Sequence, residues 1–199
     1  MAQKKSIITA LLIAATGVGI YLAAGTTPVR AAGSGPAYTS DGKLLQPKGY
    51  RNWVFIGSMV TPNGLNNGNA GFPEFHNVYV EQANLAVYRK TGVFPEGTVL
   101  VKELTLVREP SHPDGSADEA SGRGFFEGEF GGMDVTVKDS KRFSKTGNWG
   151  FFNFGHHPLP YATSSVESSK DECAGCHIAG ASKTDLTWVQ FYPVLRAKN

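Results

Sequence analysis

Two cysteines and a histidine stand together near the C-terminus at the spacing C-x-x-C-H, as Cys173, Cys176 and His177. This spacing is the signature for covalent attachment of a c-type haem, in which both thiols bond to the porphyrin and the adjacent histidine ligates the iron. The chain has 2 cysteines in all, so none remains for a disulfide. The motif therefore predicts haem c as the cofactor and His177 as the metal ligand.

Two other interpretations of such a cysteine pair are weaker. A structural zinc site needs four ligands, and no second Cys/His pair stands at the spacing typical of a zinc finger. A thioredoxin-like redox pair should follow an early strand of a βαβ unit, whereas this motif lies near the C-terminus. Haem attachment is the interpretation that uses all three residues.

The N-terminus has the layout of a secretory signal peptide over residues 1–31. Lys4 and Lys5 precede an apolar run at 7–24, and small residues follow at Ala31 and Ala32. An uncleaved membrane anchor is the alternative, since the apolar run approaches the roughly 20 residues that cross a bilayer. Export fits the haem interpretation, because bacteria attach c-type haem outside the cytoplasm. The expected location is therefore the periplasm.

The remaining chain has the length and charge of one ordinary domain. Residues 32–46 are expected to form a flexible N-terminal arm, and residues 47–199 a single haem-binding domain. The whole chain has 19 basic and 17 acidic residues, and no basic stripe suggests a nucleic-acid partner.

Alternating apolar residues and frequent turn residues predict strands as the main elements that position the haem motif. Helices are expected at 81–91 and around 165–178, where the second would carry the haem motif. A bulge or turn is expected at Gly131 and Gly132. The predicted fold class is mainly β (α+β), an antiparallel sheet with a few short helices. The expected strands cover 53–60, 75–80, 98–108, 124–138 and 149–154.

Lys102 is out of place in its predicted strand. Side chains alternate between the two faces of a strand, so Lys102 shares a face with Leu100 and Leu104. Burial of an unpaired ammonium is costly and favours the neutral amine, which is a nucleophile. The alternative is an exposed strand end from which Lys102 extends to water. Strand alternation alone does not decide between these two interpretations of Lys102.

Beyond the haem motif, the chain resembles the cytochrome P-460 family of periplasmic c-type cytochromes along most of its length after the signal. The stretches that carry the resemblance are 48–53 (KGYRNW), 60–63 (VTPN), 77–80 (NVYV), 97–104 (GTVLVKEL), 137–139 (VKD), 141–143 (KRF), 147–149 (GNW), 183–185 (KTD) and 191–196 (FYPVLR).

The resemblance implies a haem held by three covalent links, because a lysine nitrogen of the family bonds to the porphyrin and Lys102 matches that lysine. Members with this link oxidise hydroxylamine to nitrous oxide or nitric oxide. Relatives without the lysine, the β-sheet type of cytochrome c-prime, bind small gases. Lys102 therefore favours a hydroxylamine-oxidising enzyme. The alternative is a c-prime-like protein that binds nitric oxide or transfers electrons.

The resemblance also implies an acidic residue in the pocket above the iron, and Asp134 matches it as the proton acceptor. Alternation places Asp134 opposite Met133 and Val135, and the competing interpretation is a solvent-facing aspartate. A relative has glutamate at this position and arginine at the position of His76. His76 is a candidate to bind substrate or move protons, or is an ordinary residue at the start of a strand.

Other side chains could in principle occupy the sixth position of the iron and give an electron-transfer protein. None stands out, and the two adjacent histidines are expected to be loop or haem-edge residues. These candidates are Met59, Met133, His112, His156 and His157. The resemblance further implies a homodimer and a periplasmic electron acceptor such as a small cytochrome c.

Overall fold

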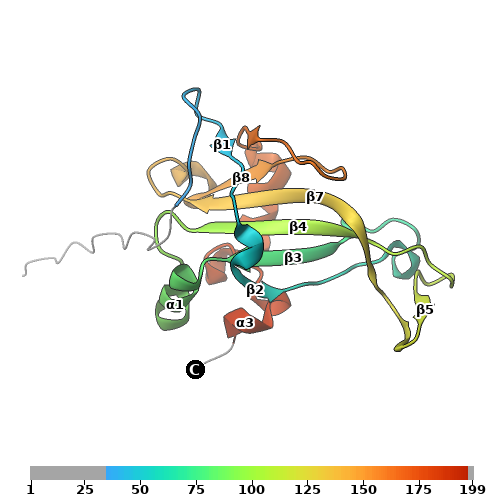
Figure 1. Ribbon diagram of the computed structural model, residues 1–199. Coiled ribbons are helices and arrows are strands. Elements are labelled where there is room, and N and C mark those ends of the chain that lie inside the picture. The colour runs from blue at the N-terminus through green and yellow to red at the C-terminus, as the bar shows by residue number, and fades with distance from the viewer. Residues whose placement is uncertain (1–34, 197–199) are drawn as a thin grey trace, which may run out of the picture.

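The main element of the protein is a five-stranded antiparallel sheet with the strand order β2-β3-β4-β7-β8. The structure is a computed structural model that describes residues 35–196, so the predicted signal peptide at 1–31 lies outside the described residues. The sheet confirms the predicted fold class and is seen across the centre of Figure 1. Its strands are β2 (Val54–Gly57), β3 (Phe75–Val80), β4 (Val99–Val107), β7 (Glu127–Lys138) and β8 (Trp149–Asn153).

Two small antiparallel pairs accompany the main sheet. The first joins β1 (Leu44–Leu45) to β9 (Ser164–Ser165), and the second joins β5 (Ala117–Glu119) to β6 (Gly122–Gly124). The predicted helix at 165–178 begins later than expected, because β9 pairs with β1 and Glu167 forms a bridge with Phe152.

The helices are short, and most follow β9. The α-helices are α1 (Gln82–Thr91), α2 (Gly175–Ala181) and α3 (Pro193–Arg196), and η4 (Lys170–Ala174) is a π-helical turn. Single 3₁₀ turns are η1 (Tyr50–Asn52), η2 (Asn63–Leu65), η3 (Ser144–Thr146), η5 (Ser182–Thr184) and η6 (Val189–Phe191). Within residues 35–196, no helix is long and apolar enough to cross a membrane.

The sheet buries both of its faces, each against a different part of the chain. On one face, Leu100 and Phe151 belong to a cluster with Tyr192 and Leu195 of the C-terminal segment. In Figure 1, paler helices of that segment lie behind the sheet, and α3 lies at its lower edge below β2. On the other face, Val101 belongs to a cluster that residues from the N-terminal segment and from the chain after β8 complete. The first face is the one that carries the site described below.

Residues 32–46 were expected to form a flexible arm, but the described part of this segment packs against the rest of the domain. β1 pairs with β9, and the side chain of Leu44 is only 1% exposed. Leu44 packs in the same cluster as Tyr50 and Val101. The sequence around Leu44 is polar, so local pattern does not predict the tertiary contact that holds this segment.

The predicted irregularity at Gly131 is confirmed as a bulge in β7. Leu104 pairs with Gly132 and Thr105 pairs with Phe130, so Gly131 is the extra residue. A Cβ atom at Gly131 would lie 2.8 Å from Cδ2 of Leu106, which explains why glycine fits this position. β7 is visibly curved in Figure 1.

A buried carboxylate organises the face of the sheet that lies away from the C-terminal helices. The Glu103 side chain is 2% exposed and accepts hydrogen bonds from the hydroxyls of Tyr50 at 2.7 Å and Tyr161 at 3.1 Å. Arg51 donates to it through Nε at 3.0 Å and also through Nη2. One carboxylate thus joins β4, η1 and the segment after β8.

We expect Glu103→Ala to reduce the free energy of unfolding by about 3 kcal/mol, because it leaves two buried hydroxyls and a guanidinium without their acceptor. Urea unfolding of the variant measures the loss. Glu119→Ala is the matched control, since it removes a surface ion pair with Arg108 and should change stability by less than about 0.5 kcal/mol. Equal effects of the two variants would contradict a structural role for Glu103.

Candidate functional site

A cavity of about 530 Å³ is lined by the first face of the sheet and by the C-terminal segment. Its volume lies in the range of about 300–1,000 Å³ that is typical of small-molecule and cofactor sites. Aromatic side chains of Trp149, Phe151 and Trp188 form much of its wall. The cavity brings together all six residues that the sequence analysis proposed for the site: His76, Lys102, Asp134, Cys173, Cys176 and His177.

A well-capped turn begins the segment that carries the two cysteines. Ser169 and Glu172 form a capping box, in which the Glu172 carboxylate accepts the Ser169 N–H at 2.7 Å. Cys173 then lies half-buried in η4, whereas Cys176 is exposed in α2, and both are free thiols. Burial raises the pKa of the Cys173 thiol. Both side chains border the cavity, as attachment of a cofactor requires.

His177 presents one defined ring nitrogen. Its Nδ1 lies 2.7 Å from the carbonyl oxygen of Leu186, a contact that requires Nδ1 to carry the proton. The Nε2 lone pair therefore remains free to act as an acceptor, and it receives the indole N–H of Trp188 at 3.4 Å. Burial lowers the pKa of His177 and so favours the neutral imidazole, which is the form that ligates metals.

Lys102 lies neither unpaired in the core nor extended into open water. It stands directly opposite Asp134 in the β4–β7 ladder, and its Nζ lies 2.8 Å from Oδ2 of that residue. The ammonium also lies 5.1 Å from the ring centre of Phe72. The cross-strand ion pair explains how a lysine can occupy the apolar face of β4. Its partner is 32 positions away in the chain, so strand alternation could not reveal it.

Asp134 lies on the cavity face, as predicted, and is held as a carboxylate. Burial by itself raises its pKa, but hydrogen bonding to His156 and the charge and hydrogen bond of Lys102 together lower the pKa to about 2. Asn153 also donates to Oδ1 through Nδ2 at 2.9 Å. Asp134 is therefore ionised at neutral pH in this structure.

His156 lines the cavity, and its contact with Asp134 was not predicted. It was expected in a loop or at the edge of the haem, but its Nε2 lies 3.3 Å from Oδ1 of Asp134. This hydrogen bond raises the pKa of His156. The close approach depends on Gly132, because a Cβ atom there would lie 3.0 Å from Cδ2 of His156. In the sequence, the one feature that could indicate this contact is therefore Gly132, a glycine in the partner strand.

His76 lies at the cavity with an unpaired ring nitrogen. The residue is 8% exposed, and its buried Nε2 has no hydrogen-bond partner. Burial and then the nearby charge of Lys102 lower its pKa to about 4. The ring of Phe72 packs edge-on against it at 5.7 Å. A neutral imidazole with an unsatisfied nitrogen is suited to form a hydrogen bond with a molecule in the cavity.

The other side chains weighed as iron ligands are placed differently. Met133 is fully buried on the opposite face of the sheet, in the cluster that contains Val101, so it cannot reach the cavity. His112 contacts Asp118 near the β5–β6 pair, and the ring of His157 contacts the carbonyl of Pro158. Met59 does line the cavity.

These observations fit a haem and define the class of the protein. One cavity of cofactor size is lined by two free thiols, a neutral histidine with an available Nε2 and aromatic side chains. The thiols and the histidine are the donor set of a c-type haem site, and here a β-sheet carries that site. The family model for cytochrome P460 matches residues 47–189. The chain therefore belongs to the cytochrome P460 family of haem proteins, and the family implies haem c binding. No match was found among curated proteins.

The low pKa of His76 predicts a pH-dependent stability. Because its folded-state pKa of about 4 lies below the ordinary value of 6.5, the unfolded chain binds the proton more readily, and stability is lost as the pH falls from about 6.5 toward 4. His76→Phe should reduce this loss, measured as urea midpoints at pH 7.5 and pH 5. His112→Gln, outside the cavity, should keep the wild-type difference. An unchanged pH dependence in His76→Phe would contradict the assignment.

Proposed function

We propose that the protein oxidises hydroxylamine to nitrous oxide or nitric oxide at a haem that is bonded to Cys173 and Cys176, ligated by His177 and linked a third time to Lys102. The observation that supports the proposal most directly is the position of Lys102. Its amine lies in the same cavity as the three residues of the haem motif, on the face of β4 that points toward them. Membership of the cytochrome P460 family agrees with this arrangement.

When bound, the haem supplies an iron that accepts electrons and offers an open position to the substrate nitrogen. The thiols of Cys173 and Cys176 would hold the group, and the Leu186 carbonyl orients His177. The walls formed by Phe151 and Trp188 limit the access of water to the cavity.

Oxidation of hydroxylamine releases protons together with electrons, so the cavity needs a proton acceptor. Asp134 has this role. Its pKa of about 2 depends on the hydrogen bond with His156 and on the positive charge of Lys102 beside it. A link between the Lys102 nitrogen and the haem would remove that charge, so it would raise the pKa of Asp134 and make the carboxylate a stronger base.

His156 completes a route for protons to solvent. It contacts Asp134 on the cavity side, and its own side chain is 46% exposed. Asp134 passes the proton to His156, which releases it to water. His76 is placed to bind the substrate, since its unpaired Nε2 is the one buried ring nitrogen without a partner among the described residues.

The expected signal peptide and the family support a proposal for the setting of the reaction. We propose that the protein works in the periplasm as a homodimer and passes electrons to a partner such as a small cytochrome c. Hydroxylamine is the small-molecule substrate.

Mass analysis of haem peptides tests the proposal. After proteolysis, the haem peptide should include the segment around Lys102 as well as Cys173 and Cys176. Lys102→Gln should leave haem attached to the cysteines but remove the third link and the turnover of hydroxylamine with an added electron acceptor. Lys90→Gln, a change at an exposed residue of α1, is the matched control and should keep both. Intact haem with neither the third link nor turnover in the wild type would favour a c-prime-like protein.

The proposed proton route predicts that substitutions of its two residues lower kcat by different amounts. Asp134→Asn should lower kcat by about 100-fold or more, because the positioned base is lost. His156→Gln should lower kcat by about tenfold, a smaller loss within the range of a proton-transfer group because water can take over its task. The pKa of His156 is raised, and only the neutral ring accepts a proton, so wild-type activity should fall as the pH drops below that pKa. This acid-side decline should weaken in His156→Gln. An identical pH profile would remove His156 from the route.

A further inference from the structure

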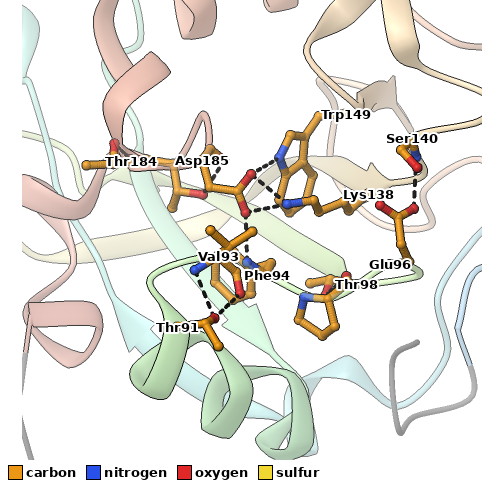
Figure 2. Close-up of polar contacts among 12 residues, drawn as sticks. Thr91, Val93, Phe94, Glu96, Thr98, Lys138, Ser140, Trp149, Thr184 and Asp185 are labelled. Atoms are coloured by element: carbon orange, nitrogen blue, oxygen red, sulfur yellow. Dashed lines mark hydrogen bonds and ion pairs between the residues drawn. The ribbon is translucent and has the colours of Figure 1, made fainter. Parts of the chain in front are cut away.

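One largely buried carboxylate that does not line the cavity makes contacts with several parts of the chain. Asp185 follows η5 and accepts hydrogen bonds from three side-chain or backbone groups that come from different parts of the chain. Its two oxygens each lie 2.7 Å from Nζ of Lys138, and Oδ1 accepts the indole N–H of Trp149 at 3.2 Å. Oδ2 also accepts the backbone N–H of Phe94 at 2.7 Å. Figure 2 shows these contacts converging on Asp185.

The contacts fix Asp185 to the end of the sheet. Lys138 is the last residue of β7, Trp149 is the first residue of β8, and Phe94 lies in the loop between α1 and β4. The side chains of Lys138 and Asp185 are 7% and 11% exposed, so this is a largely buried ion pair. Such a pair is specific in geometry, because removing one partner leaves the other buried without its counter-charge.

The backbone at this point is also unusual. Asp185 and Leu186 both have a positive φ, 54° and 55°, a conformation that few residues other than glycine adopt. The turn closes with a hydrogen bond from the Leu186 N–H to the Ala181 carbonyl at 3.0 Å. The Leu186 side chain packs closely on Gly147, where a Cβ atom would lie 2.6 Å from Leu186 Cδ1. A strained turn of this kind persists only when its surroundings hold it.

The same turn orients the haem-ligating histidine. The carbonyl that accepts the Nδ1–H of His177 belongs to Leu186, the residue directly after Asp185. We propose that Asp185 is a positioning residue for His177. By fixing the turn to the sheet, it sets the place of the Leu186 carbonyl and hence the orientation and basicity of the imidazole. The proposal rests on ligation by His177 but not on any activity toward hydroxylamine.

The physical effect is transmitted through one hydrogen bond. A strong bond from Nδ1–H to a carbonyl makes the imidazole more basic, and a more basic axial ligand stabilises the oxidised iron. Loss of the Asp185 contacts lets the turn relax and weakens this bond. The reduction potential of the haem should then rise, and the iron–histidine bond should weaken.

The experiment compares haem-loaded Asp185→Asn and Asp185→Ala with the wild type. Asparagine tolerates the positive φ but has one carbonyl oxygen where aspartate has two, so it cannot keep every contact. In Asp185→Ala, the ratio of oxidised to reduced haem at a fixed potential should change about tenfold, which is 59 mV for a one-electron couple. Asp185→Asn should shift in the same direction by less. In both variants the iron–histidine stretching frequency of the reduced haem should fall.

Glu96→Gln is the matched control. It also removes one carboxylate charge at this end of the sheet, where Glu96 accepts the Ser140 N–H at 2.8 Å, but it has no contact with the 185–186 turn. It should leave the stretching frequency unchanged. A raised potential in the Asp185 variants without a lower stretching frequency would be the effect of lost charge alone and would overturn the proposal. If Asp185→Ala does not fold, Asp185→Asn decides, and a wild-type frequency in that variant rejects the role. Neither readout requires hydroxylamine turnover, so failure of the proposed activity is seen separately.

Discussion

The antiparallel register of the main sheet is the constraint on which the cavity depends. Residues that pair directly across strands point to the same face, and here Val78, Lys102, Asp134 and Asn153 form one row across four strands. The row places an amine, a carboxylate and an amide side by side under the C-terminal segment. A slip of one residue at any of these pairings would turn a strand's contribution to the opposite face. The chemistry of the cavity is thus a property of strand pairing more than of any single loop.

Each face of β4 carries one charged side chain, and the two charges are compensated in different surroundings. Lys102 and Glu103 are neighbours in the chain but point to opposite sides, and each has a charged partner. Glu103 is enclosed by tyrosine hydroxyls and an arginine and holds the fold together. Lys102 is paired with Asp134 beside an open cavity, where its amine remains accessible. The difference in surroundings separates a structural charge from one that is available for chemistry.

Local pattern predicted much of this arrangement. The bounds of β3 matched the expected strand, α1 ended before Gly92, and Asp134 lay on the face that alternation assigned to it. The haem motif was readable because its function requires three residues within five positions. The contact of His156 with Asp134 could not be predicted from local pattern, because it depends on a glycine in a neighbouring strand. Leu44 and Asp185 were missed for the same reason: their roles arise from contacts with residues far away in the chain.

The presence of Lys102 and Cys173 at one cavity has a consequence for the chain as a polymer. A haem bonded to both would close a covalent loop of about seventy residues that starts within β4 and includes β7 and β8. By the chain-entropy relation used for disulfides, a loop of that length restricts the unfolded state by about 4 kcal/mol. The prosthetic group would then act as a cross-link in a protein whose two cysteines are both committed to it. Such a link would make the domain harder to unfold.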